Sequence, residues 1–218
     1  MDLSRTALIL IDMQKESKYG IERVNEAVAA AVPLIDACRH LGIPIIYTRH
    51  VSRIDAIGLP NDDVLDDQGR PVYYRSDSDT MNVIDAIAPR PNDIVIDKHR
   101  WSGFHGTSLD LMLRSLDIKH LIMGGFTTDC CLMTTVFDGY ARDYQVSLVK
   151  DICAATNDGS HKAAILMMAN WVYDLEIFNS TEMLKKLRGE PYHSWLSTAP
   201  DQLQFTADSL DQIFAKLG

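Results

Sequence analysis

The chain has 218 residues, which is enough for one α/β domain with a full hydrophobic core, and its apolar content of 46% is ordinary for a globular protein. Its formal net charge is −9 and no run of Lys and Arg is longer than two residues, which argues against a nucleic-acid partner or an anionic membrane partner. No apolar run approaches the roughly 20 residues that a membrane-spanning helix needs.

The cysteines and the first residues bear on the cellular compartment. Cys38, Cys130, Cys131 and Cys153 have neither the spacing of a disulfide framework nor that of a zinc knuckle. Residues 1–5 lead directly into an apolar run, so we expect no signal peptide. A reduced, cytoplasmic location is the simplest interpretation of both features.

Apolar runs and segments of helical period alternate along most of the chain. In chain order, the pattern predicts a strand over 7–11, a helix over 21–41, a strand over 43–47, an irregular loop over 51–78, a short helix over 81–87 and a strand over 93–97. It then predicts a helix over 107–116 that Thr107 caps, a strand over 119–123, a helix over 128–144, a strand over 145–149, a helix over 160–171, a strand over 175–178 and a helix over 180–187. The remainder is predicted to be a loop and a terminal helix.

The predicted strands are continuously apolar, which is typical of parallel strands that are buried on both faces. Six βα units of this kind predict a three-layer α/β/α domain with a six-stranded, mostly parallel sheet. Because the sequence has no internal repeat or linker, we expect a single domain over 1–218, in which 189–218 form a C-terminal extension. The loop over 51–78 is unusually long, and such loops are usually functional.

Three polar residues follow predicted strands at one rim of this sheet. Asp12 follows the first strand, Lys98 follows the third, and Cys131 lies beyond the fourth. Ligands bind beyond the carboxyl ends of the strands in an open α/β sheet, so we expect these side chains to meet. The carboxylate can exchange a proton with the thiol, the lysine can stabilise a thiolate, and the thiolate can attack a carbonyl carbon.

The stretch from Gly124 to Cys131 follows a strand and opens a helix. Unpaired N–H groups and the positive end of the helix dipole lower the pKa of a thiol at such a position and stabilise an oxyanion. We therefore predict that Cys131 is a thiolate nucleophile. The alternative for a single cysteine is a small apolar packing residue, and we expect Cys38 and Cys153 to be such residues in the core. Cys130 either packs or lines the wall of the pocket.

These segments resemble the three hallmarks of the isochorismatase-like cysteine hydrolases, a group that includes nicotinamidases, N-carbamoylsarcosine amidases, biuret hydrolases and ureidoacrylate hydrolases. The matching segments are Asp12-Met13-Gln14, Lys98, and Gly125 to Cys131, with a further match over Ser102 to Leu109. The resemblance extends from about residue 6 to residue 178. It implies the fold of that family and a catalytic triad of Asp12, Lys98 and Cys131.

The resemblance also implies finer features of the site. The backbone N–H groups of Thr127 and Cys131 would form an oxyanion hole, and the peptide between Phe126 and Thr127 would be cis. Phe104 would line the substrate pocket. The implied reaction is hydrolysis of a small-molecule amide or ureido substrate through a thioester, without a cofactor, by a homodimer or homotetramer.

The same family contains metal-dependent nicotinamidases with an Asp-x-His cluster soon after the second strand. Residues 48–53 read Thr-Arg-His-Val-Ser-Arg and lack this cluster, so we expect no catalytic metal. His50 either hydrogen-bonds the substrate or only ends a strand. Trp101 either forms a wall of the pocket or covers the rim of the sheet.

Two further segments have alternative interpretations. Some side chains in or beside the long loop either bind a polar substrate tail or belong to a solvated lid. These side chains are Arg49, Arg53, Tyr73, Tyr74 and Arg75. The C-terminal segment is apolar enough to pack on its own domain or on a neighbouring subunit, and the segment 163–169 is apolar nearly all round, which suggests a subunit interface.

Two other functions compete with an amidohydrolase. The first is an isochorismatase-type vinyl-ether hydrolase, which represents another branch of the family that the chain resembles. That branch typically lacks the cysteine because an aspartic acid protonates an alkene. The presence of Cys131 disfavours it. A non-enzymatic binding relative is the third possibility, and the intact set of Asp12, Lys98 and Cys131 argues against it.

Overall fold

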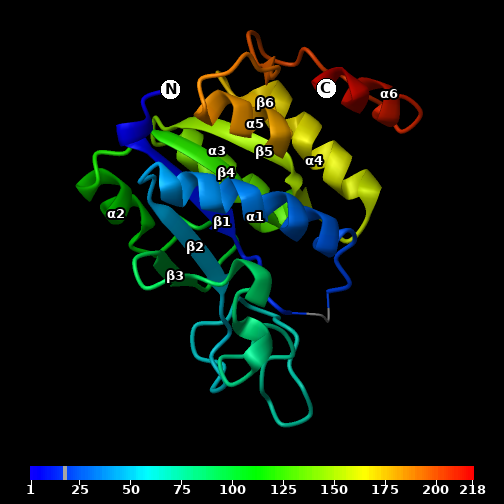
Figure 1. Cartoon of the computed structure of the whole chain (residues 1–218). Helices are drawn as coiled ribbons and strands as arrows, with labels where there is room; N and C mark the ends of the chain where they lie inside the picture. The colour runs from blue at the N-terminus through cyan, green and yellow to red at the C-terminus, as the bar shows by residue number, and fades with distance from the viewer. Residues whose placement is uncertain (17–18) are drawn as a thin grey trace.

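The computed structural model describes residues 1–16 and 19–218. A seven-stranded sheet in the order β3-β2-β1-β4-β5-β6-β7 forms its centre (Figure 1). The strands are β1 (Thr6–Ile11), β2 (Ile45–His50), β3 (Ile94–Lys98), β4 (His120–Phe126), β5 (Gln145–Ala154), β6 (Glu176–Phe178) and β7 (Trp195–Leu196). The helices are α1 (Val24–His40), α2 (Leu109–Ser115), α3 (Met133–Tyr140), α4 (Asp158–Trp171), α5 (Ser180–Leu187) and α6 (Leu210–Phe214).

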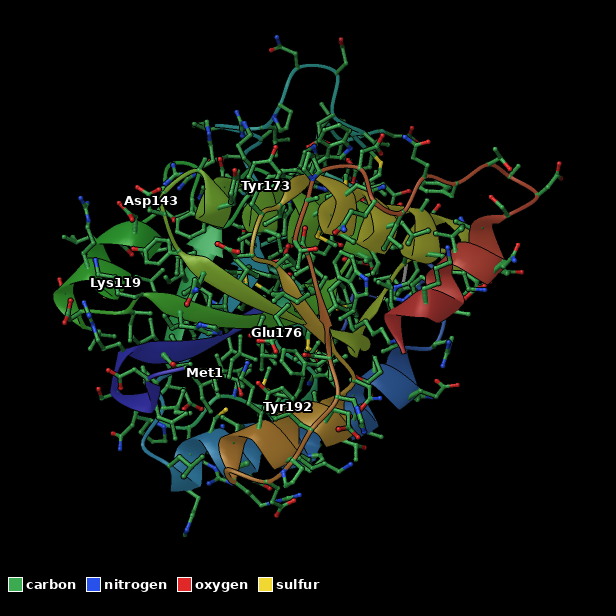
Figure 2. All side chains as sticks on the ribbon, turned by 90° about the horizontal axis from the view of Figure 1, so that it is seen from above. Met1, Lys119, Asp143, Tyr173, Glu176 and Tyr192 are labelled. Atoms are coloured by element: carbon green, nitrogen blue, oxygen red, sulfur yellow. The ribbon has the colours of Figure 1, made fainter. Side chains whose placement is uncertain are left out.

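Alternate residues of the central strands point into two hydrophobic cores, one on each face of the sheet. Along β1, Ala7, Ile9 and Ile11 belong to the core that α2, α3, α4 and α6 complete. Leu8 and Leu10 belong to the core that α1 and α5 complete. Figure 2 shows these layers from above, with α1 and α5 on one side of the sheet and α4 on the other. Because helices cover both faces, the strands are continuously apolar.

The predicted three-layer, mostly parallel architecture is confirmed, but the sheet has one strand more than predicted. Strands β1 to β6 correspond to the six predicted strands and pair in parallel. The seventh, β7, pairs antiparallel with β6 and comes from the C-terminal extension, where the sequence predicts a loop. A two-residue strand leaves no periodic apolar pattern, so the sequence does not reveal it.

Several helix boundaries differ from their predicted positions. The predicted helix over 128–144 is a π-helical turn, Thr128–Leu132, followed by α3. The short helix over 81–87 is two 3₁₀ turns, Asp79–Met81 and Asp85–Ile87. Helix α1 begins at Val24 because the preceding residue has a φ of +58°, outside the right-handed helical region.

The long loop and the C-terminal segment lie at opposite ends of the molecule. The loop over 51–78 projects away from the sheet (cyan in Figure 1), and a bridge between Ser52 and Arg75 ties its base together. The C-terminal segment packs on its own domain: Phe205, Ile213 and Phe214 lie against the core beside α4. Within the described ranges, no helix is both long and apolar enough to cross a bilayer.

Candidate active site

Asp12 directly follows β1 and is placed by β2. Its backbone has a φ of +49°, and its N–H donates to the carbonyl oxygen of Thr48 at 3.1 Å. The Thr48 hydroxyl in turn donates to Asp12 Oδ1 at 2.7 Å. Both side chains are buried. The carboxylate is therefore held at the carboxyl end of the central strand, with Oδ2 left to face other groups.

Lys98 ends β3 and reaches Asp12 across the intervening strand β2. Neighbouring strands are about 4.8 Å apart, so a long side chain is needed to cover two spacings. The ammonium group is almost completely buried, and Nζ lies 2.6 Å from Asp12 Oδ2. It also donates to the carbonyl oxygen of Arg100 at 3.0 Å. Burial opposes the Lys98 charge, but the carboxylate of Asp12 and the sulfur of Cys131 outweigh it and raise the pKa of Lys98.

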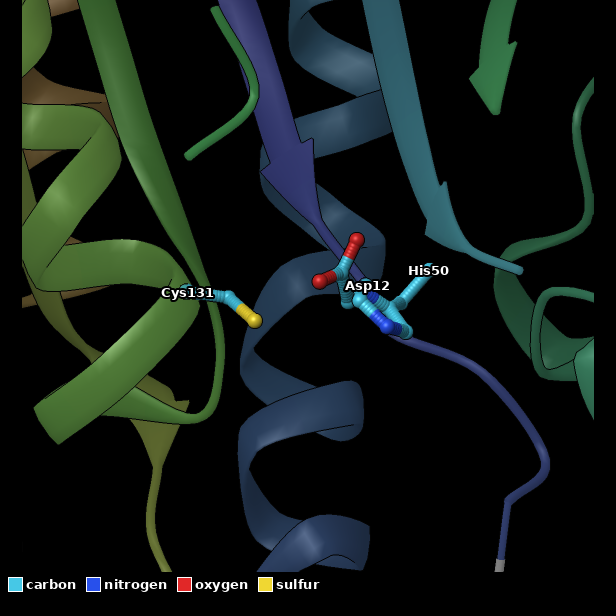
Figure 3. A group of neighbouring side chains, drawn as sticks. All are labelled: Asp12, His50 and Cys131. Atoms are coloured by element: carbon cyan, nitrogen blue, oxygen red, sulfur yellow. The ribbon is translucent and has the colours of Figure 1, made fainter. Parts of the chain in front are cut away.

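Cys131 approaches the same ammonium group from the other side of β1. Its Sγ accepts a hydrogen bond from Lys98 Nζ at 3.4 Å, and Figure 3 shows the thiol pointing from its turn toward the Asp12 carboxylate. The close approach depends on Gly125, which has a φ of +130° and lies against β1. A Cβ there would lie 2.1 Å from the carbonyl oxygen of Ile11, so no other residue allows the two strands to come this close.

The pKa of the thiol differs from the sequence-based expectation. The helix start predicts a lowered pKa for Cys131, whereas the adjacent Cys130 thiol, burial and the Asp12 carboxylate raise it, and Lys98 only partly opposes them. The partly buried Cys130 shifts the other way, through its contact with Cys131 and the charge of Lys98. The Cys131 thiol is therefore less readily ionised than its place at a helix start predicts, and a neighbouring base such as Asp12 would assist its ionisation.

His50 ends β2 and completes the group around the ammonium. Its Nδ1 lies 3.3 Å from Lys98 Nζ, so it accepts from the lysine and the proton of the neutral ring is on Nε2. Burial, then the charge of Lys98, lower the pKa of His50 to about 4. The ligand atoms of Asp12, His50 and Cys131 lie within 4.8 Å of one another, in the arrangement drawn in Figure 3. The Lys98 ammonium contacts all three, and its charge would repel a metal cation from that position.

Aromatic side chains from loops surround His50 and the thiol. Trp101 stacks on His50 with ring centroids 5.3 Å apart, and Tyr74 meets His50 edge-on at 5.0 Å. Tyr19 lies 5.3 Å from Tyr74 and 4.9 Å from Tyr73. We call Trp101, Tyr74, Tyr73 and Tyr19 the aromatic wall. The structure thus brings three of the four predicted substrate-binding residues together near the triad.

The pKa of Tyr19 reflects its position beside the thiols of Cys130 and Cys131. Burial, then the charges of Cys131 and Cys130, raise the pKa of Tyr19 to about 12. Burial, then Asp12 and Cys131, raise the pKa of Tyr74. Sequence reasoning did not select Tyr19. The available signal was its place in the loop that follows Asp12, because loops after strand carboxyl ends border the ligand site.

Phe104 does not join this group, contrary to the role that the resemblance implies. Its ring is buried in the core, where it stacks on Tyr144 at 5.9 Å and contacts Gly139. Tyr144 directly precedes β5, so the ring points toward the amino end of the sheet, away from the triad. The backbone N–H of Gly103 is bonded to Thr135, which fixes the segment in this orientation.

The arginines of the long loop are already paired within the chain. Arg53 is bonded to Asp55 and Arg75 to Asp77, in each case through two nitrogen atoms. Arg49 is bonded to Asp97 at 2.7 and 3.0 Å. These contacts favour the interpretation of a solvated, self-paired loop over that of a carboxylate-binding tail.

The backbone at the nucleophile also agrees with the implied family. The peptide between Phe126 and Thr127 is cis, as the resemblance implies. The isochorismatase domain, as a family model, matches residues 6–177. The chain belongs to the isochorismatase domain family. Family membership accounts for the three-layer fold.

Individual relatives agree with this assignment. Over 191 residues the chain is 27% identical to YaaI of Bacillus subtilis, an uncharacterised isochorismatase family protein, and the match covers 85% of this chain and 100% of YaaI. A cysteine hydrolase from Pseudomonas syringae pv. phaseolicola has 27% identity and a TM-score of 0.76, over 87% of this chain and 95% of that one. An N-carbamoylsarcosine amidase from Thermoplasma acidophilum has 30% identity and a TM-score of 0.65, over 82% and 98%. The chain is an isochorismatase-like cysteine hydrolase by family.

Proposed function

We propose that the protein is a metal-independent amidohydrolase that cleaves a C–N bond of a small amide or ureido compound through a thioester. The observation that carries this proposal is the position of Lys98 Nζ, 2.6 Å from Asp12 Oδ2 and 3.4 Å from Cys131 Sγ. A buried carboxylate and a thiol that lie within 4.8 Å of each other and both contact one cation are suited to acyl transfer to sulfur.

In the first half-reaction, Asp12 takes the proton of Cys131 while Sγ attacks the carbonyl carbon. The raised pKa of this thiol makes the base necessary. The carbonyl electron pair moves to oxygen, and the N–H groups of Thr127 and Cys131 stabilise the oxyanion. The C=O bond then re-forms, the C–N bond breaks, and the proton on Asp12 moves to the departing nitrogen, which leaves as ammonia or an amine.

In the second half-reaction, a water oxygen attacks the carbonyl carbon of the thioester while Asp12 accepts a proton from that water. The C–S bond breaks, the sulfur takes the proton back, and the acid product leaves. Lys98 remains a cation throughout, because its pKa is raised by the two groups it contacts. Its charge stabilises the Cys131 thiolate when Asp12 takes the thiol proton and again when the C–S bond breaks.

The aromatic wall is an argument for a flat, uncharged substrate. His50, Trp101 and Tyr74 present ring faces and edges beside the thiol, and the neutral His50 has an Nε2–H to donate. Arg49, Arg53 and Arg75 are paired with carboxylates of β3 or of their own loop, so these three side chains are not free for a carboxylate substrate.

Ammonia release tests the function across a panel of small amides: nicotinamide, biuret, N-carbamoyl amino acids, maleamate and ureidoacrylate. We expect release from at least one uncharged member and no dependence on added metal or chelator. Iodoacetamide labelling is the companion measurement. If alkylation of Cys131 in the intact protein leaves ammonia release unchanged, the nucleophile assignment fails. Activity toward isochorismate without ammonia release would favour the vinyl-ether hydrolase instead.

A further inference from the structure

A hydrogen bond connects the nucleophile turn to helix α4. Thr128 opens the π-helical turn that contains Cys131, and its side chain is completely buried. Its Oγ1 lies 2.9 Å from Nδ1 of His161, which is on the first turns of α4. Within the turn, the carbonyl oxygen of Thr127 accepts from the N–H groups of Cys130 at 3.2 Å and Leu132 at 3.1 Å. The His161 contact joins this turn to α4, in addition to the contact of Cys131 with Lys98 of β3.

His161 itself borders an empty volume. A cavity of about 190 Å³ lies among α1, β5 and α4, and His161 and Phe214 are among its lining residues. A side chain beside open space is free to change rotamer unless a neighbour restrains it. Phe214 supplies that restraint, because its ring meets the imidazole at 5.8 Å and 63°.

The C-terminal helix that carries Phe214 is anchored on both sides of His161. Lys162 pairs with Asp211 at 2.6 Å, which joins α4 to α6. Lys150 on β5 donates to the carbonyl oxygen of Leu217 at 3.1 Å, just beyond α6. His161 therefore contacts both Phe214 of the C-terminal extension and Thr128 of the nucleophile turn.

We propose that His161 is a positioning residue, which holds the nucleophile turn through Thr128 and is itself held by Phe214 of the C-terminal helix. This inference rests on the proposed role of Cys131. The Sγ–Nζ contact of 3.4 Å depends on the position of the turn. A displacement of about 1 Å at a reacting group costs up to about 100-fold in rate.

The test compares two isosteric variants with a matched control. Thr128→Val keeps the shape and removes the hydroxyl, and His161→Phe keeps a ring for Phe214 to contact and removes Nδ1. Thr128→Ser retains the hydroxyl and is the control. We expect each of the first two to lower the rate of Cys131 alkylation by iodoacetamide and the kcat for amide hydrolysis by about 10-fold, with KM little changed. The Ser variant should remain within about 2-fold of the wild type.

The double variant distinguishes a shared hydrogen bond from two independent effects. Thr128→Val combined with His161→Phe should be no slower than either single variant, because the same contact is lost in each. The pH at which alkylation becomes fast should move upward in both single variants, since the thiol loses part of its contact with Lys98. Phe214→Leu replaces the ring that contacts His161 with a smaller side chain. It should lower the rate of Cys131 alkylation and kcat by less than Thr128→Val or His161→Phe does.

The outcomes separate this inference from the proposed function. A wild-type Cys131 that is unreactive toward iodoacetamide overturns both. A reactive wild type with unchanged rates and pH profiles in Thr128→Val and His161→Phe overturns the positioning role alone. Multiplicative losses in the double variant also overturn it. Far-UV circular dichroism and thermal unfolding establish that each variant is folded, and if His161→Phe is not, the Thr128→Val and Thr128→Ser pair decides.

Discussion

The triad and the aromatic wall lie side by side but are built in different ways. Asp12 follows the buried strand β1, Lys98 ends β3, and the π-helical turn that carries Cys131 comes shortly after β4. Tyr19, Tyr74 and their neighbours come from loops and are held by contacts among themselves. The comparison suggests a division: the sheet positions the chemistry, and the loops select the substrate. Substitutions in the triad should change kcat, whereas substitutions in the wall should change KM.

The largest expected effect separates the two adjacent cysteines. Cys131→Ala should lower kcat/KM by at least about 10⁴-fold, because the attacking atom is gone. Cys130→Ala should retain most activity, because Lys98 contacts the sulfur of Cys131. Ammonia release by both purified variants measures this. Equal losses in the two variants would contradict the assignment and point to a shared thiol pair as the nucleophile.

The alkylation of Cys131 should follow pH in a defined direction. Because the pKa of this thiol is raised, its reaction with iodoacetamide should still be increasing at a pH where an ordinary thiol is fully ionised. In Cys130→Ala the alkylation of Cys131 should reach its plateau at a lower pH, because the contact with the Cys130 thiol is the first cause of the raised pKa. A plateau near neutral pH would indicate that Lys98 outweighs burial and Asp12.

Removal of the cation should have the next largest effect. Lys98→Met should lower kcat by about 10²- to 10³-fold, because the thiolate loses its nearest positive charge. It also leaves the buried Asp12 carboxylate unpaired, which costs about 3–5 kcal/mol of stability. The control is the double variant Asp12→Asn with Lys98→Met. It should recover much of the thermal stability and none of the activity, and recovery of activity would contradict the catalytic roles of both Asp12 and Lys98.

The parts of the molecule that the sequence predicts well are those that follow strand periodicity. Asp12 and Lys98 were found because each follows a continuous apolar run, and Cys131 because the glycine-rich turn before it has a fixed relation to the fourth strand. The parallel sheet was predicted for the same reason. The motif match, in addition, separated Cys131 from Cys130.

Features that depend on side-chain direction or on long-range packing were not predictable. Phe104 lies in the matched segment, but the hydrogen bond from Gly103 to Thr135 turns its ring toward the amino end of the sheet. The lowered thiol pKa was expected from the helix start, and burial with Asp12 reverses it. Tyr19 was missed because a single tyrosine in an irregular loop has no periodic pattern, and its place beside the thiols depends on contacts with Tyr73 and Tyr74.

His50 lies at the boundary between the two regions, since it ends a strand and also contacts the wall. His50→Asn retains an acceptor near the Nδ1 position for Lys98 and removes the Nε2–H, whereas His50→Gln retains a donor near Nε2. If the ring mainly supports Lys98, the Asn variant should lose less kcat than the Gln variant; if it mainly donates to substrate, the order reverses. We expect losses of about 10-fold, divided between kcat and KM.

The pH dependence of stability gives an independent measure of His50. Its folded pKa of about 4 lies below the unfolded value of about 6.5. A lowered histidine pKa contributes stability that is present above the unfolded pKa and is lost as pH falls toward the folded value. The thermal midpoint should therefore fall between about pH 6.5 and pH 4, and it should fall less steeply in His50→Asn. Burial also lowers the pKa of His120 to about 4, so His120 adds to the loss of stability over the same pH range. It is present in both the wild type and His50→Asn.

The smallest expected effects come from a comparison of substitutions in the aromatic wall with substitutions of arginines in the loop over 51–78. Tyr74→Leu and Trp101→Leu remove ring contacts with His50 and should raise KM about 3- to 10-fold with little change in kcat, because they act on substrate binding. Arg53→Gln and Arg75→Gln should change KM by less than about 2-fold, because both guanidinium groups are already paired with Asp55 and Asp77. Steady-state kinetics on one active amide compares the four variants directly. A large increase in KM for an arginine variant would mean that its pairing within the loop is exchanged for a substrate carboxylate, and the substrate would then be an anion instead of the flat, uncharged amide that the wall favours.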